Sequence, residues 1–124
     1  MSSVFFLLSG LGIIYLVKDK LFDSNLANNN IKDFLNKKDV ILIDVRSKDE
    51  FDVGHFNKAI NIPHKEINQN SVNRIRHKCS YCRYLIYCRS GRRAKIAFNK
   101  FRKLGLKNVY YTTYDFKTLQ KKTN

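Results

Sequence analysis

The sequence predicts one α/β domain in which helices flank a central parallel sheet. Its 124 residues suit a single domain, and 44% hydrophobic and 27% charged residues are typical of a globular protein. Short apolar runs alternate with segments of helical periodicity, as expected for strands and helices that alternate along an α/β chain. The run at residues 40–45 is apolar except for Asp44, which suits a strand buried on both faces of a parallel sheet.

An apolar, uncharged run at residues 4–17 precedes this domain. It lacks the charged start and the small-residue cleavage site of a signal peptide, and it is shorter than a full transmembrane helix. We predict that residues 1–20 are a membrane anchor; the alternatives are an export signal that is not cleaved and a helix that packs on a partner. Lysines after the run place a membrane-associated domain on the cytoplasmic side, whereas export would make it periplasmic. The Asn-rich residues 21–30 form a linker, and the domain occupies 31–124.

The first half of the domain contains two predicted strands and three short helices. Residues 31–35 have helical spacing, and the strand at 40–45 follows. Ser47 and Glu50 stand at the spacing of a capping box, so a short helix begins there and ends near Gly54. A second strand at 59–62 ends at Pro63, and a helix covers residues 67–75.

The second half is centred on a strand at residues 84–87 that leads into a basic, Gly-containing loop. Apolar residues recur at helical spacing from Ala94 to Leu104, and Gly105 stands where a helix C-cap glycine belongs. A strand at 109–111 and a short helix at 116–121 complete the chain.

The net charge of +14 is unevenly distributed along the chain. Residues 71–124 hold fifteen Lys and Arg but one acid, Asp115, whereas residues 1–70 hold nine of each sign. This charge is interpreted as a solvated surface, as a funnel for anionic substrates or as a contact with anionic lipid. We expect no nucleic-acid partner, because no such motif is present and the basic residues are spread over several elements.

The three cysteines do not resemble a disulfide framework, because their number is odd and at least one thiol is therefore free. Cys79 and Cys82 form a Cys-x-x-Cys pair near His77, which is half a zinc site, a redox or sulfur-relay pair, or a structural feature. Cys88 lies between a strand end and a helix start, where unpaired N–H groups and the helix dipole favour a thiolate. The alternative for Cys88 is a buried structural cysteine.

Two motifs in this order resemble the rhodanese family of single-domain sulfurtransferases. The first, at residues 44–63, reads Asp-x-Arg, Glu-Phe, Gly-His and Ala-x-Asn-x-Pro and includes Asp44, Arg46, Glu50, Gly54 and His55. The second is the sequence Cys-Arg-Ser-Gly-Arg-Arg-Ala at residues 88–94, and the resemblance extends over about residues 28–122.

The resemblance implies a rhodanese-like three-layer fold and sulfur transfer. Cys88 would take a sulfane sulfur from thiosulfate or a similar anionic donor and, as a persulfide, pass it to a thiol or cyanide acceptor. The residues that bind the donor would be Arg89, Ser90, Gly91, Arg92 and Arg93. The family uses no metal or organic cofactor. The first motif is interpreted as structural, with Arg46 and Glu50 paired across the first helical turn and His55 outside the chemistry.

Loop length separates sulfur transfer from a related activity. Phosphatases that resemble rhodaneses have a loop one residue longer, which would require an arginine in place of Ala94. The rival interpretations are a non-catalytic rhodanese-like binding module and a thiol redox or arsenate-type reductase. Many family members have a Gly-Gly pair and a tryptophan after the last strand; this chain has neither there, which leaves the shape of the final loop open.

Overall fold

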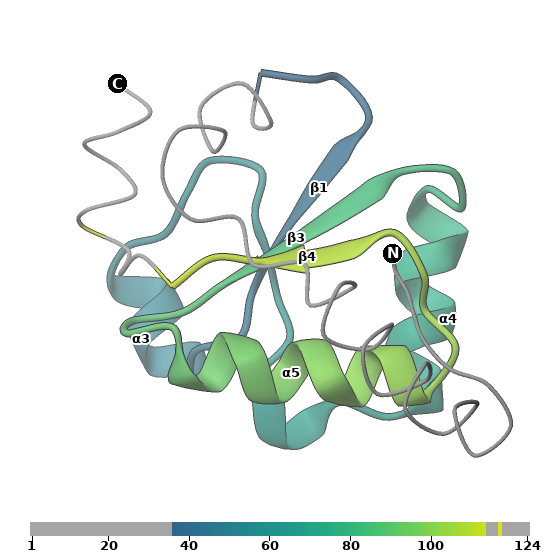
Figure 1. Ribbon diagram of the computed structural model, residues 1–124. Helices are drawn as coiled ribbons and strands as arrows, with labels where there is room; N and C mark the ends of the chain where they lie inside the picture. Colours follow the sequence, from purple (N-terminus) through teal and green to yellow (C-terminus); the bar gives the residue numbers. More distant parts are fainter. Residues whose placement is uncertain (1–35, 114–116, 118–124) are drawn as a thin grey trace, which may run out of the picture.

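A computed structural model describes residues 36–113 and 117 of the chain (Figure 1). It contains a four-stranded sheet in the order β2-β1-β3-β4. The elements, in chain order, are β1 (Val40–Asp44), α3 (Lys48–Val53), β2 (Ile60–Asn61), the 3₁₀ turn η2 (His64–Glu66), α4 (Gln69–Lys78), β3 (Arg83–Tyr87), α5 (Arg92–Lys103) and β4 (Val109–Tyr111).

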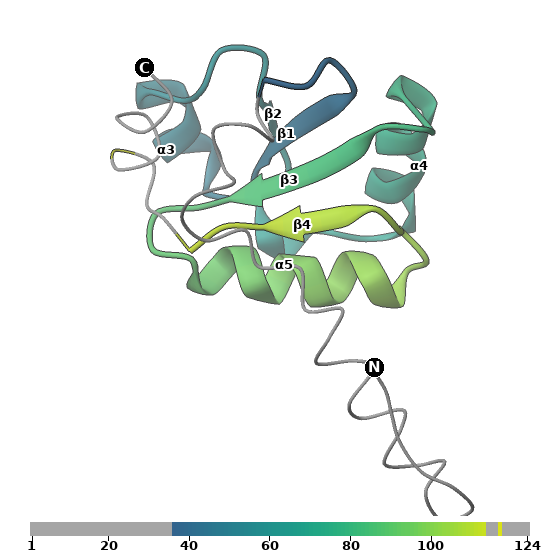
Figure 2. The same cartoon turned by 45° about the horizontal axis from the view of Figure 1, so that its top comes forward.

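All strand pairs are parallel, so the four strands run in one direction and their carboxyl ends point to the same edge of the sheet. β1 pairs with β2 and β3, and β3 pairs with β4. Figure 2 shows the arrowheads of β3 and β4 pointing toward α3 and the start of α5, while α4 lies beside the strand starts. The predicted α/β class with a central parallel sheet is confirmed.

The larger core lies on the face of the sheet that α4 and α5 cover. Val72 and Ile75 of α4 and Phe101 of α5 are fully buried there against Ile43 and Ile86. This packing explains the helical spacing of the apolar residues, since both helices turn one apolar stripe toward the sheet.

A smaller cluster occupies the opposite face. Leu85 and Tyr87 are buried there, and the Tyr87 ring packs edge-on against Phe56 from the segment after α3. The strands are therefore apolar on both faces, as their β-branched runs predicted.

The helix ends follow the predicted local chemistry. Ser47 accepts from the Glu50 N–H, and the Glu50 side chain returns a bond to the Ser47 backbone, so the predicted capping box of α3 is confirmed. Gly105 follows α5 with a φ of 92°, and the N–H groups of Gly105 and Leu106 bond back to Arg102 and Phe101. This bond pattern is that of a Schellman motif, which satisfies the last carbonyls of the helix.

Several boundaries differ from the prediction. The helix expected at 67–75 begins at Gln69, where Asn68 caps it, and it continues to Lys78. The strand expected at 59–62 pairs over only two residues, because Pro63 and η2 follow at once. The predicted helices at 31–35 and 116–121, the linker and the apolar run at 4–17 lie outside the described residues, except for Lys117.

The prediction of a membrane-associated protein is wrong for the part of the chain that the structure describes. Within residues 36–113, no helix is long and apolar enough to cross a membrane. The longest of these helices, α5, has 12 residues, far fewer than the roughly 20 that a bilayer requires, and it carries several basic side chains. The alternative of an exported, periplasmic protein relied on the same apolar run. We therefore retain neither the membrane-associated cytoplasmic location nor the periplasmic one.

Candidate active site

Cys88 lies at the carboxyl edge of the sheet, between the end of β3 and the first turn of α5. Its Sγ accepts hydrogen bonds from the backbone N–H groups of Gly91, at 2.9 Å, and Ala94, at 3.3 Å. Ala94 is in the first turn of α5, whose N–H groups have no partner within the helix. Two converging N–H donors and the positive end of the helix dipole therefore favour negative charge on the sulfur.

Gly91 is required by both its backbone conformation and its surroundings. Its φ of 88° lies in the left-handed region, and a Cβ at this position would be 2.7 Å from the Cα of Thr113. The loop is thus packed against the segment that follows β4. This contact joins residues 22 positions apart, and no local pattern in either segment indicates it.

The Cys88 side chain has no solvent-exposed surface in this conformation. Sulfur chemistry at this residue therefore requires a local movement that uncovers Sγ. The buried thiol is the free cysteine that the odd count predicted.

Arg93 connects the loop to the first motif. Its two terminal nitrogens contact both carboxylate oxygens of Glu50, at 2.7 and 3.0 Å. The hydrogen bond from Arg93 is the main cause that lowers the pKa of Glu50 to about 2, and the same bond raises the pKa of Arg93. Proximity to Cys88 is a smaller cause that raises the pKa of Arg93, so this arginine lies within electrostatic reach of the sulfur while Glu50 holds it in place.

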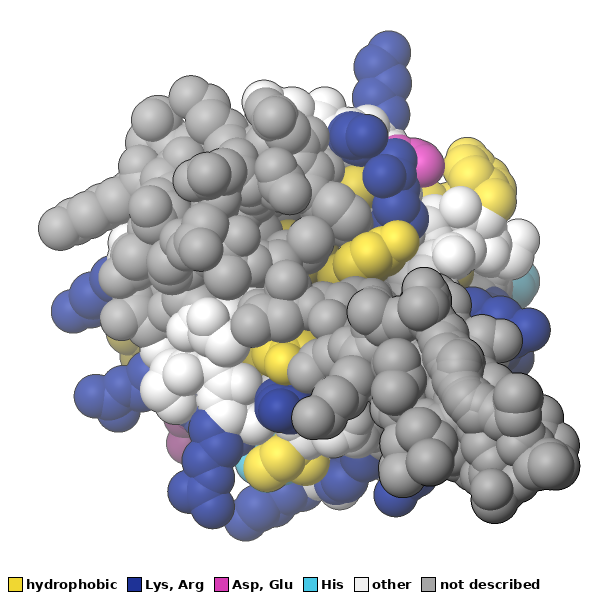
Figure 3. Space-filling view, viewed as in Figure 1, with side chains coloured by type: hydrophobic (Ala, Val, Ile, Leu, Met, Phe, Trp, Pro, Cys, Tyr) yellow, Lys and Arg dark blue, Asp and Glu magenta, His cyan; other side chains and the backbone are white. Residues whose placement is uncertain are grey.

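The other basic residues of the loop face solvent. Arg89, Ser90 and Arg92 are exposed, and none of them forms a salt bridge with another described residue. In Figure 3 the described surface shows many Lys and Arg side chains and few acidic ones. The rim of the loop is therefore positively charged and open to an anion.

The first motif forms a structural clamp beneath this site. Asp44 is buried, and the Arg46 guanidinium bonds to both of its carboxylate oxygens and to the Gly54 carbonyl, at 2.6–3.1 Å. The Asn61 amide donates to the carbonyls of Asp44 and Arg46, which holds the end of β1 and the residues after it against β2.

The predicted pairing of Arg46 with Glu50 is wrong. Arg46 precedes the N-cap Ser47 and is not on the helix, so the four-residue spacing does not bring the two side chains together. The buried Asp44 carboxylate needs a partner, which Arg46 supplies, and Glu50 pairs with Arg93.

Two histidines have different positions relative to the loop. His55 stacks on Phe51 and contacts its carbonyl oxygen, so its interactions are local to the end of α3. His64, which we did not predict, follows β2 at the carboxyl edge, where burial and the charges of Lys100 and Arg93 lower its pKa. Its place in the sequence, directly after the Pro63 that ends a strand, could have indicated that His64 lies at this edge of the sheet.

Cys79 and Cys82 form a disulfide at the other end of β3. All of β3 separates Cys82 from Cys88, a span of roughly 20 Å at about 3.3 Å per residue. Within one molecule, neither a direct sulfur relay to Cys88 nor a zinc site that includes it fits this geometry.

Comparisons with known proteins agree with this architecture. The family model of the rhodanese-like domain matches residues 27–122. A putative mitochondrial thiosulfate sulfurtransferase of Schizosaccharomyces pombe is 32% identical over 98 residues, covering 72% of this chain and 69% of that protein. A tRNA uridine(34) hydroxylase of Aster yellows witches'-broom phytoplasma is 33% identical over 97 residues, which cover 77% of this chain and only 31% of that longer protein.

Solved structures share the fold. A human single-domain sulfurtransferase superposes with a TM-score of 0.64 at 20% identity, covering 82% of this chain and 98% of that chain. A Helicobacter pylori protein superposes with a TM-score of 0.63 at 26% identity, covering 80% of this chain and 84% of that chain. The family match over most of the chain, together with the shared parallel sheet, establishes that this chain belongs to the rhodanese-like domain family.

Proposed function

We propose that this domain is a sulfurtransferase that moves a sulfane sulfur from thiosulfate or a similar anionic donor to a thiol or cyanide acceptor. The observation that carries the proposal is the pair of N–H groups, from Gly91 and Ala94, that converge on Cys88 Sγ. Such donors stabilise a thiolate before the reaction and the charge of a persulfide after it.

The proposed reaction has two displacement steps. The Cys88 thiolate attacks the outer sulfur of thiosulfate, a Cys88 persulfide forms, and sulfite leaves with the electron pair of the broken S–S bond. An acceptor thiolate or cyanide then attacks the outer sulfur of the persulfide, and Cys88 leaves as a thiolate. The sequence of steps needs no external oxidant, metal or organic cofactor.

The charged residues of the loop have separate proposed roles. Arg89 and Arg92 are exposed on the rim, where they attract the donor anion, and Ser90 lies between Arg89 and Gly91. Arg93, held by Glu50, supplies a fixed positive charge near the sulfur. The first motif supports the loop through Glu50 alone, which holds Arg93. Asp44, Arg46 and Gly54 bond to one another, His55 contacts Phe51, and none of them has a role in the proposed chemistry.

The rival functions receive less support from the geometry. A reductase that uses Cys88 with Cys79 and Cys82 would require the two ends of β3 to meet. A non-catalytic module would not need two donors directed at a free thiol. The chain spans about a third of the length of the hydroxylases it matches, and the hydroxylation in their name is not part of the proposal.

The test compares thiosulfate-to-cyanide and thiosulfate-to-thiol transfer by the wild type and by Cys88→Ser. We expect the variant to lose transfer, while a Cys79→Ser and Cys82→Ser double variant serves as the matched cysteine control and keeps it. Transfer that is unchanged in Cys88→Ser would exclude the proposal.

A further inference from the structure

An exposed lysine precedes every strand of the sheet. The pairing sets the starts of β1, β3 and β4 nearly level at the edge opposite Cys88, because Val40 lies opposite Arg83 and Tyr84 opposite Val109. β2 begins three residues further along, with Ile60 opposite Ile43. These exposed lysines are Lys37 and Lys38 before β1, Lys58 before β2, Lys78 before β3 and Lys107 before β4. These lysines are far apart in the sequence, but the sheet brings the strands that follow them side by side.

The strand order places the lysines before β1, β3 and β4 in a row. Adjacent strands are about 4.8 Å apart, so these three strand starts extend over roughly 10 Å. Asp39 is the acid that accompanies Lys37 and Lys38, and Arg83 neutralises it through a salt bridge at 3.0 Å. Among the described residues, none of the lysines in the row takes part in a salt bridge.

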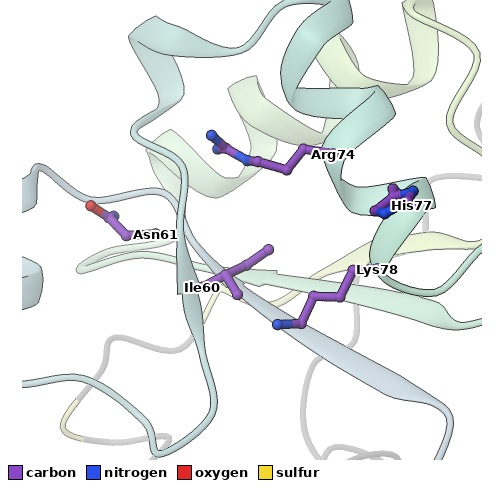
Figure 4. A pocket seen from close by; sticks show the side chains of 5 residues that line it. All are labelled: Ile60, Asn61, Arg74, His77 and Lys78. Carbon is purple, nitrogen blue, oxygen red and sulfur yellow. The ribbon is translucent and has the colours of Figure 1, made fainter.

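The last turns of α4 widen the positive surface. Arg74, His77 and Lys78 line a surface pocket of about 420 Å³ together with Ile60 and Asn61 of β2. Figure 4 shows the long side chains of Arg74 and Lys78 extending from α4 toward the β2 side. No acidic residue lines this pocket, and three of its five lining residues, Arg74, His77 and Lys78, have basic side chains.

A second pocket lies on the other flank of α4. It has a volume of about 460 Å³, and its lining includes Arg76, Ser80 and Lys107. The positive surface therefore continues from β2 across the end of α4 to the start of β4.

An exposed aromatic ring stands within this surface. Tyr81 is 78% exposed and lies between Cys79 and Cys82, three residues after Lys78. The disulfide closes the turn that carries it, and the Tyr84 hydroxyl donates to the Cys79 carbonyl. The ring is thus presented on a constrained turn beside the cations, where a flat group can stack on it.

We propose that this edge, defined by Lys37, Lys38, Arg74, Arg76, His77, Lys78, Tyr81 and Lys107, binds single-stranded nucleic acid. A row of cations follows a phosphate backbone, and an exposed aromatic ring stacks on an unpaired base. An acidic protein segment would satisfy the cations but would give the ring no base to stack on. The expectation of no nucleic-acid partner relied on the absence of a motif and on the spread of basic residues over several elements, and the fold brings some of those elements together.

The inference is independent of the sulfurtransferase proposal, because the surface is at the opposite edge from Cys88. Fluorescence anisotropy with a labelled oligouridylate, run over a series of salt concentrations, measures binding by the full chain. An oligothymidylate of equal length tells RNA preference from general single-strand binding, and either result supports the inference. Polyglutamate of matched charge serves as the polyanion competitor.

Three variants identify the surface. Tyr81→Ala is expected to weaken oligouridylate binding about fivefold or more. Lys78→Gln and Lys107→Gln are each expected to weaken binding and to reduce the slope of log affinity against log salt by about 0.7. Lys65→Gln, an exposed lysine in η2 beyond the other end of β2, is the matched control and leaves binding unchanged.

Two results would contradict the inference. Oligouridylate that does not bind, or that binds all four variants as it binds the wild type, excludes this surface. Polyglutamate that competes as well as oligouridylate, with no effect of Tyr81→Ala, identifies a site for acidic protein segments instead. Thiosulfate sulfur transfer by Tyr81→Ala and Lys78→Gln stays at the wild-type rate, so failure here and failure of the sulfurtransferase proposal are separate outcomes.

Discussion

Replacement of Gly91 by alanine tests how the loop holds Cys88. Gly91 has a φ of 88°, donates to Cys88 Sγ and contacts the segment after β4. The substitution keeps the N–H group but adds one methyl group. It therefore disturbs the geometry around the sulfur without removing a charge or a donor.

The expected loss of stability has two parts. A left-handed conformation costs an alanine about 1–2 kcal/mol. The added Cβ would also be 2.7 Å from Thr113 Cα, which is backbone and cannot rotate away, and overpacking of this kind costs about 1–3 kcal/mol. We therefore expect Gly91→Ala to lower the free energy of unfolding by about 2–5 kcal/mol.

Gly105→Ala is the matched control. Its φ is 92°, but the nearest atom to an added Cβ is the end of the Arg76 side chain, at 3.4 Å. It should lose only the conformational part, about 1–2 kcal/mol, and keep sulfur transfer. Urea denaturation measures both stabilities, and kcat/KM for thiosulfate measures activity. Gly91→Ala with the stability of Gly105→Ala and full activity would refute this account of the loop.

Three further predictions test the pairing, the core and the disulfide. Glu50→Gln should cost about 1–2 kcal/mol at neutral pH, discounted because both partners are partly exposed. The folded pKa of Glu50 is about 2, below its ordinary 4.5, so the wild type loses this stability as the pH falls from 4.5 to 2. The free energy of unfolding of Glu50→Gln should therefore depend less steeply on pH over this range. An equally steep dependence in the variant contradicts the pairing. Phe101→Ala should cost about 3–5 kcal/mol in urea denaturation because the ring is fully buried, whereas Ile96→Ala, 37% exposed on the same helix, should cost far less; equal losses contradict the assigned core. The Cys79→Ser and Cys82→Ser double variant should keep its kcat for sulfur transfer, since roughly 20 Å separates the pair from Cys88, and a lost kcat would require a relay.

The strands and the helix ends could be predicted because their causes are local. Apolar runs at residues 40–45 and 84–87 contain their own evidence of burial, and the parallel sheet buries both. Ser47, Glu50 and Gly105 act on backbone groups within a few residues, so their spacing alone predicts caps. The position of Cys88 also follows from a strand, a turn and a helix in sequence order.

Contacts between distant residues could not be predicted. Arg93 and Glu50 are 43 residues apart, and local spacing offered Arg46 as the nearer partner for Glu50. The packing of Thr113 on Gly91 depends on how β4 lies beside β3, which no pattern within either segment specifies. The row of lysines is similar, since it exists only because β1, β3 and β4 begin nearly level at one edge of the sheet.

The central claim is that Cys88 carries the transferred sulfur. Mass spectrometry of the protein after incubation with thiosulfate and removal of excess donor tests it most directly. We predict that the peptide containing Cys88 gains one sulfur atom and loses it again when a thiol or cyanide is added. A peptide that stays unmodified, or sulfur found only on Cys79 or Cys82, would contradict the account.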